Sequence, residues 1–297
     1  MIKNSYIIEK IPTETIKNAM KENKNIPRIR TSNTIANGII EPHFFYKKLN
    51  SEKIRKLYKG NYIQLWKDNY EILKNIIPLN DIYCIVENED GDIYEFSKII
   101  SEDKFLSGGT IQSWNDLKKL YLKILNYINR IIQYQKTSKQ SIGIETAIWN
   151  FTIDGKLFDL DPPRFLRSEE DSSFTRKEDI NQCKRTIYRN FTEIGMKTNL
   201  LATVIIGLQD GNFFIPDLPN CWLDIFTRHL IQSVEDKNKR QKIEEILIGK
   251  GNFKSNFTKH PIDIILEEKN KKILGGINME RYNKEQQFIF VTGPSES

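Results

Sequence analysis

Residues Trp149–Asp161, which read WNFTIDGKLFDLD, carry the strongest structural signal in this chain. The Asp154-Gly155 pair lies between two runs of alternating apolar and polar residues. Asp-Gly favours a two-residue type I′ turn, in which both turn residues adopt φ > 0. A two-residue loop fixes the strand register, so Asn150 is predicted to face Asp159. The stretch therefore predicts a β-hairpin with one apolar face and one polar face.

The polar face of this hairpin gathers an amide and two carboxylates. Asn150 and Asp159 are predicted to lie opposite each other, with Asp161 two residues further along, at Cβ spacings of roughly 5–8 Å. Oxygen ligands at such spacings suit a hard cation such as Mg²⁺. An ordinary solvated face is the alternative interpretation, because many antiparallel hairpins have one buried and one solvated face. The predicted core residues of the opposite face are Trp149, Phe151, Ile153, Phe158 and Leu160.

The residues on either side of the hairpin extend this pattern. Glu145 precedes Asn150 by five residues, and a Pro-Pro-Arg sequence ending at Arg164 follows Asp161. In this order of acid, amide and acid the chain resembles the protein-kinase-like superfamily, particularly its aminoglycoside and small-molecule phosphotransferase branch. The resemblance implies that Glu145 holds the position of the catalytic acid. Asn150 and Asp161 then hold the metal-binding positions, with Asp159 as a further carboxylate of that site.

The chain departs from the family pattern at three positions. Glu145 is one methylene longer than the usual aspartate, and a base displaced by about an ångström can cost roughly 100-fold in rate. Gly143 stands where a His or Tyr is usual, and Pro162 stands where Phe-Gly would begin. A catalytically impaired pseudokinase that binds nucleotide and regulates other proteins is therefore the alternative hypothesis.

Residues 1–100 are predicted to form a small lobe of strands and one long helix. Short β-like runs lie at 38–40 and 44–46, and a helical pattern covers 52–77. A second hairpin is predicted around the turn at 88–91. This order of elements matches what the resemblance implies for a kinase-like amino-terminal lobe.

The resemblance also implies a phosphate-binding lysine on a strand and a glutamate partner on the helix that follows. Lys47 is the candidate lysine, and Lys48 stays open because alternation alone does not identify the one that faces the cleft. Glu71 is the candidate partner. Solvated lysines and an exposed glutamate are the alternative for these residues. Arg164 is a candidate for binding phosphate beside the metal, and pairing with a neighbouring carboxylate is its alternative role.

Residues 101–297 are predicted to form a mainly helical lobe that contains the hairpin at 148–161. Helical patterns cover 113–132, 179–194 and 222–234. The predicted fold class is therefore α+β, with a two-lobed, protein-kinase-like arrangement. The predicted function is phosphoryl transfer from ATP or GTP, with Mg²⁺, to a small molecule or a peptide.

Composition limits the other classes of protein. The three cysteines are widely spaced and form no C-x-x-C motif, which disfavours a disulfide framework or a structural zinc site. No run of about 18 apolar residues and no apolar signal core occur, so a soluble, cytoplasmic protein without a membrane partner is expected. A nucleic-acid-binding protein is a further alternative, suggested by the net charge of +6 and interleaved aromatic residues. The helical spacing of Tyr121, Tyr127 and Tyr134 favours core packing over base stacking.

Overall fold

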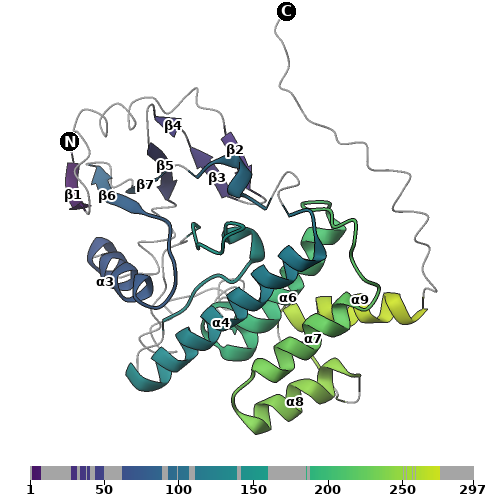
Figure 1. The fold of residues 1–297 in the computed structure, drawn as a ribbon. Helices are drawn as coiled ribbons and strands as arrows, with labels where there is room; N and C mark the ends of the chain where they lie inside the picture. Colours follow the sequence, from purple (N-terminus) through teal and green to yellow (C-terminus); the bar gives the residue numbers. More distant parts are fainter. Residues whose placement is uncertain are drawn as a thin grey trace, which may run out of the picture.

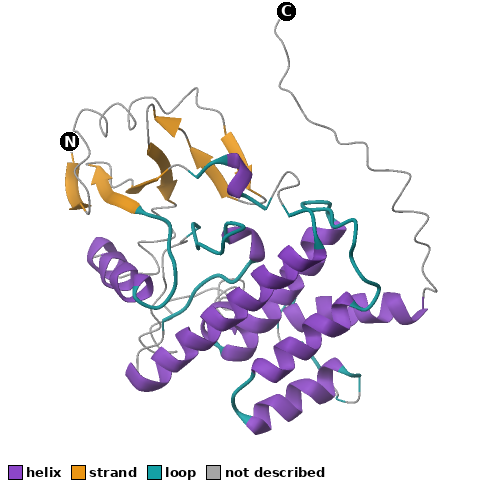
Figure 2. Cartoon of the chain, in the orientation of Figure 1, coloured by secondary structure: helices purple, strands orange, loops and turns teal. Residues whose placement is uncertain are grey.

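The computed structural model belongs to the α+β class and is mostly helical. Its strands gather at one end and most of its helices at the other (Figure 1, Figure 2). The described residues are 2–7, 28–31, 34–37, 39–40, 44–49, 62–88, 93–98, 100–106, 111–138, 142–159, 185, 188–249, 251, 253–255, 257 and 259–274.

The larger sheet is antiparallel, with five strands in the order β1-β6-β7-β5-β4. A separate hairpin joins β2 to β3. The predicted hairpin around 88–91 is confirmed as β6–β7, and the β-like runs at 38–40 and 44–46 contribute to β4 and β5. The strands are β1 (Ile2–Ile7), β2 (Arg28–Thr31), β3 (Thr34–Asn37), β4 (Ile39–Ile40), β5 (Phe44–Leu49), β6 (Ile82–Asn88) and β7 (Ile93–Lys98).

Helix α3 (Tyr62–Lys74) connects the two halves of this sheet in the chain, because it follows β5 and precedes β6. Its buried residues recur every three or four positions, as an amphipathic helix requires; they include Ile63, Trp66, Tyr70 and Leu73. The helix ends shortly before Pro78, because the residue before a proline disfavours the helical conformation. The amino-terminal part of the predicted 52–77 helix lies outside the described residues.

Two of the predicted helices of the carboxy-terminal part are confirmed as α4 and α7. The third prediction, 179–194, lies partly outside the described residues, although 188–191 are helical. Tyr121 and Tyr127 of α4 are buried, as their spacing predicts. The elements of this part are η1 (Glu102–Lys104), α4 (Trp114–Ser138), η2 (Ile148–Asn150), α6 (Glu193–Gln209), α7 (Trp222–Ser233), α8 (Lys237–Leu247) and α9 (Pro261–Leu274).

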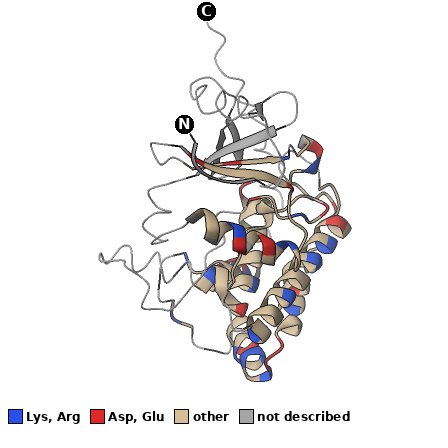
Figure 3. Ribbon diagram, turned by 90° about the vertical axis from the view of Figure 1, so that its left-hand side faces the viewer, with Lys and Arg blue, Asp and Glu red and all other residues tan. Residues whose placement is uncertain are grey.

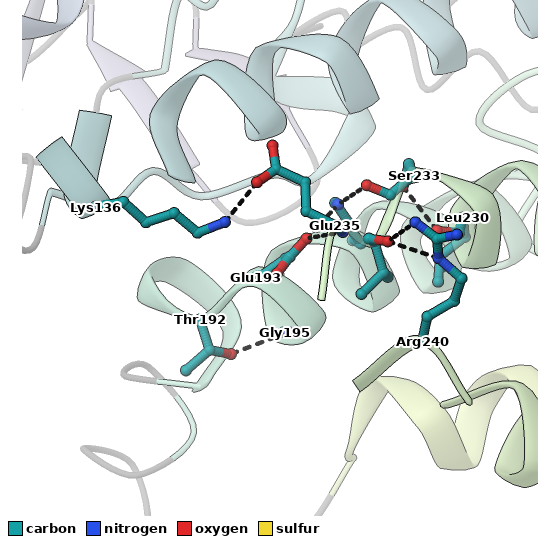
Figure 4. A network of polar contacts seen from close by, with 10 residues as sticks. Lys136, Thr192, Glu193, Gly195, Leu230, Ser233, Glu235 and Arg240 are labelled. Atoms are coloured by element: carbon teal, nitrogen blue, oxygen red, sulfur yellow. Dashed lines mark hydrogen bonds and ion pairs between the residues drawn. The ribbon is translucent and has the colours of Figure 1, made fainter. Parts of the chain in front are cut away.

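Helix α6 is buried on almost every side, which makes it the centre of the helical part. Its first turns carry a charged pair inside the protein: Lys197 Nζ lies 2.8 Å from Glu193 Oε1 and is fully buried. Lys197 also donates to the Ser233 carbonyl at 2.7 Å, and Glu193 Oε1 accepts the Glu235 amide (Figure 4). Arg240 donates to the carbonyl of Val234 in the same turn. The network therefore joins α6 to the α7–α8 connection, and its several hydrogen bonds offset the cost of burying two charges.

Charges on the described helices are mixed in sign. Both blue and red residues occur over the helical part in Figure 3. Within the described part of the chain, no helix has both the length and the apolar character needed to cross a bilayer.

A buried histidine packs among aromatic rings just before α9. The His260 ring lies 4.5 Å from the Tyr188 ring, 4.5 Å from that of Phe257 and 4.8 Å from that of Phe253, between centroids. Its Nδ1 accepts the Ile262 amide at 3.2 Å. An apolar environment and an accepting nitrogen both favour the neutral imidazole.

This packing predicts a loss of stability in mild acid. Burial lowers the pKa of His260 to about 4, with Asp263 opposing and Arg189 adding to the shift. Unfolded histidine titrates near 6.5, so protonation favours the unfolded chain as pH falls from about 6.5 towards 4. We expect the wild type to lose about 2 kcal/mol more than His260→Phe between pH 7 and pH 5 in urea unfolding. Burial also lowers the pKa of His229, so His229→Gln serves as the comparison and should remove a smaller part of the acid-induced loss than His260→Phe does. Equal pH dependence in wild type and His260→Phe would contradict the assignment.

Candidate functional site

The hairpin after η2 closes with a three-residue loop, and the predicted two-residue loop is wrong. Phe151 forms an antiparallel bridge with Leu157, and the Thr152 amide donates to the Lys156 carbonyl at 2.9 Å. Gly155 has φ of 83°, the left-handed conformation that ends a three-residue loop of this kind. The Asp-Gly signal therefore located the turn correctly but assigned its length wrongly.

The side chain of Thr152 explains the longer loop. Its hydroxyl accepts the Lys156 amide at 2.9 Å and donates to the Asp154 carboxylate. This hydrogen bond from Thr152 is the main reason that the pKa of Asp154 is lowered. Such side-chain bonds compete with the regular strand ladder. They favour a turn with one more residue than the sequence pattern predicts.

A shift of one residue in the pairing register turns the side chains of one arm to the opposite face, so different side chains are buried. Leu157 is 1% exposed, and its bridge partner Phe151 is fully buried. Trp149 and Ile153, predicted as core residues, are half-buried and pack against the hydrophobic core, whereas Phe158 is half-buried and is not part of that cluster. Leu160, the last predicted core residue, lies outside the described residues.

The shifted register still brings the two arms with metal-binding candidates together. The predicted pairing of Asn150 with Asp159 is wrong, because the longer loop shifts the register by one residue. The Phe158 amide donates to the Asn150 carbonyl at 3.0 Å, so Asn150 pairs with Phe158 and Asp159 is the next residue. Asn150 is buried in η2, a short 3-10 helix, where the sequence predicts a strand. Asp159 is half-buried. Amide and carboxylate oxygens on adjoining arms suit a hard cation.

Asp161 and Arg164 lie outside the described residues, as does the loop after them. The described residues contain no cluster of three His, Cys, Asp or Glu side chains that could hold a metal. Asn150 and Asp159 are thus the two described candidates for metal ligation.

The segment that carries Glu145 is held against α6 by threonine hydroxyls. The Thr146 hydroxyl donates to the Met196 carbonyl at 2.7 Å and accepts from Asn199 Nδ2 at 3.3 Å. The Ile148 amide donates to Thr203 Oγ1 at 3.0 Å. These residues were missed by the sequence analysis. Their signal is a set of polar residues inside an otherwise apolar helix, where each needs a hydrogen-bond partner.

Glu145 is half-buried and lies between two buried neighbours, Ile144 and Thr146. Arg189 is close enough to interact with it electrostatically. Burial and the nearby Arg185 lower the pKa of Arg189, and Glu145 opposes that shift. Arg189 Nε is buried without a hydrogen-bond partner among the described residues. A cationic neighbour for Glu145 was not predicted, because Arg189 lies far from it in the sequence.

The strand candidates for phosphate binding are placed by backbone register. Lys47 is opposite Glu95 of β7, and Lys48 is opposite Tyr94. The side chains of both lysines lie outside the described part of the chain. Glu71 pairs with Lys74 of its own helix at 2.6 Å and is 37% exposed. The predicted pairing of Lys47 with Glu71 therefore stays a prediction.

The hairpin docks directly beneath the connection from α3 to β6. The Leu157 amide donates to the Pro78 carbonyl at 3.0 Å, and the Asn80 amide donates back to the Leu157 carbonyl at 2.8 Å. The Ile153 amide donates to the Lys104 carbonyl at 2.9 Å. These bonds tie the helical part to the sheet (Figure 1). The candidate metal ligands consequently lie on a segment that contacts both parts of the molecule.

Comparison with known proteins leaves the family open. No protein-family model matches this chain, and no curated protein matches it. The function is therefore inferred from the site's own residues.

Proposed function

We propose that this chain is a phosphotransferase that uses Mg²⁺ and ATP or GTP and acts on a small molecule or a peptide. The supporting observation is the placement of the Asn150–Asp159 hairpin, which hydrogen-bonds to the α3–β6 connection beneath the sheet. The sheet order β4-β5-β7-β6, with α3 between β5 and β6 in the chain, suits a kinase-like amino-terminal lobe. In this proposal residues 1–100 form that lobe, residues 101–297 form the helical lobe, and the protein is cytoplasmic.

Each candidate residue has one role in the proposal. Asn150 and Asp159 hold Mg²⁺ together with Asp161, because their oxygens suit a hard cation. The ion, when bound, neutralises charge on the nucleotide phosphates. Lys47 binds those phosphates, and Glu145 orients or deprotonates the acceptor group.

Arg164 and Glu71 complete the predicted set of nucleotide-binding residues. Arg164 would bind phosphate with its bidentate guanidinium. Glu71 was predicted to orient Lys47; it pairs with Lys74 of its own helix, and the proposal assigns it no direct contact with nucleotide.

Metal-dependent nucleotide binding is the first test of this function. Because Asp159 would face phosphate oxygens, we expect ATP to stabilise the protein only with Mg²⁺, by about 2.7 kcal/mol at a hundredfold excess over Kd. Asp159→Asn should remove this stabilisation with little change in the melting temperature of the free protein. Thermal shift with and without Mg²⁺ measures both quantities.

Asp103→Asn is the matched control, because Asp103 is an exposed carboxylate of η1 outside the proposed site. Its nucleotide response should equal that of the wild type. Equal stabilisation of the wild type with and without Mg²⁺, or none at millimolar nucleotide, would contradict the proposed function.

A pseudokinase that binds nucleotide without transferring phosphate is the second candidate. The observation that favours it is the proximity of Arg189 to Glu145, since a carboxylate that interacts with a guanidinium is less available as a base. Nucleotide binding without phosphate transfer to any acceptor would distinguish this candidate from the first.

A further inference from the structure

Strand β7 carries a buried carboxylate at the middle of the sheet. Glu95 is 3% exposed, and β7 has a strand on each side. On one side its register partner is Ile85 of β6, and on the other it is Lys47 of β5. A buried carboxylate among apolar residues is costly unless a cation or several donors compensate it.

The face of the sheet that contains Glu95 packs on the main hydrophobic core. Ile85, opposite Glu95, and Ile93, two residues before it, both belong to the core cluster that includes Tyr70 of α3. Position 47 lies directly opposite Glu95, so it belongs to this same face. Successive residues of a strand alternate between faces, so position 48 belongs to the other face, together with its partner Tyr94. The register thus separates the two lysines that the sequence left open.

Glu95 interacts electrostatically with Tyr70 of α3 and with Cys84 of β6. Burial raises the pKa of Tyr70, and Glu95 contributes to the rise. Burial likewise raises the pKa of Cys84 to about 12, with a further contribution from Glu95. Glu71, the glutamate predicted from the helix, is far more exposed and contacts Lys74.

We propose that Glu95 of strand β7, in place of Glu71 of helix α3, is the acidic partner of Lys47. Side chains directly opposite each other on antiparallel strands have Cβ atoms roughly 4.5–5.5 Å apart, within reach of a Lys–Glu pair. The pair orients the lysine towards the core-facing side of the sheet. That Lys47 then binds nucleotide phosphate rests on the proposed function.

A partner on a strand has a different consequence from a partner on a helix. Lys47 and Glu95 belong to neighbouring strands joined by backbone hydrogen bonds, so their separation does not depend on the position of α3. The lysine is therefore oriented before nucleotide binds, and a displacement of α3 leaves the pair intact.

A double-mutant cycle on the full chain tests the pair without nucleotide. Glu95→Gln removes the proposed acidic partner of Lys47, and we expect the unfolding equilibrium constant of this variant in urea to rise roughly 100-fold. Lys47→Met should have a similar effect. If the two substitutions acted independently, the unfolding equilibrium constant of the double variant would rise by the product of the two single effects. We expect the measured constant to be at least about tenfold smaller than this, because the double variant removes both charges.

Two matched cycles serve as controls. Lys48→Met with Glu95→Gln, and Lys47→Met with Glu71→Gln, should each be additive within about threefold. Additive effects of Lys47→Met and Glu95→Gln, or strong coupling of Lys47 to Glu71, would overturn the proposal. If Glu95→Gln does not fold, Lys47→Met combined with Glu95→Leu should restore folding, since apolar residues can replace a buried pair. Failure of that rescue would also count against it.

Nucleotide titration separates this proposal from the proposed function. If Mg²⁺–ATP binds, Glu95→Gln should weaken it about tenfold and Glu71→Gln should leave it within threefold. The opposite ranking would overturn Glu95 as the partner. If the wild type binds no nucleotide while the stability cycle shows coupling, the pair stands and the proposed function fails.

Discussion

Gly143→Ala is expected to cost about 3 kcal/mol or more of folding stability, because no space exists for a side chain at this position. A Cβ at Gly143 would lie 2.2 Å from the Asn190 carbonyl oxygen and 2.7 Å from Phe191 Cδ1. The oxygen is part of the backbone and accepts the Ile144 amide at 3.1 Å, so it cannot move without losing that bond. Gln135 also donates to the Phe191 carbonyl at 3.2 Å and restrains the same segment. Urea unfolding of the variant measures the loss.

Gly249→Ala is the control for this substitution. Gly249 has φ of 77° and no atom within 4 Å of an added Cβ, so alanine there meets backbone strain without a clash. We expect a cost of about 1 kcal/mol. A loss at Gly143 no larger than that at Gly249 would show that the segment adapts.

Gly143→His tests whether this position accepts the histidine that is usual in the kinase-like superfamily. A histidine at this position is usual in the resembling family, yet a larger side chain would meet the same carbonyl as alanine does. The variant should therefore be less stable than Gly143→Ala, and it should not increase activity. The close approach of residues 190–191 explains why glycine occupies position 143.

Glu145→Gln is expected to lower the rate of ADP formation with a true acceptor by roughly 10²- to 10⁴-fold, the usual contribution of a general acid or base. Nucleotide affinity should stay near the wild-type value, because Asn150 and Asp159 are unchanged. The threonine hydrogen bonds to α6 hold the segment, so the amide should occupy the place of the carboxylate. Coupled-assay kinetics and nucleotide titration on the same preparations separate rate from binding.

Glu145→Asp and Glu267→Gln complete this comparison. The aspartate restores the family's usual residue and shows whether the extra methylene helps or hinders catalysis. Glu267 is an exposed glutamate of α9, and its substitution should leave the rate unchanged. An unchanged rate in Glu145→Gln would remove this residue from the mechanism. Tight nucleotide binding without transfer by the wild type would favour the pseudokinase.

Local patterns in the sequence were sufficient for several elements. The helical spacing of apolar residues predicted α4 and α7, and alternating residues around a turn predicted β6–β7. Such elements are readable because one face of each is buried, and burial imposes the period of the backbone on the sequence. The pairing of β1 with β6 was not predicted, because strand partners distant in the chain share no local pattern.

The same distinction between local sequence pattern and tertiary packing applies to the candidate site. From the sequence alone, Gly155 located the turn that brings the arms of Asn150 and Asp159 together. The loop length, the cation beside Glu145 and the register of Lys47 against Glu95 came only from the tertiary structure. Hydrogen bonds of the Thr152 hydroxyl favour a loop one residue longer than predicted. Contacts between distant segments place Arg189 near Glu145 and Glu95 opposite Lys47. Hydrogen bonds and burial between such segments depend on how the elements pack, and that packing is not encoded in any short stretch of residues.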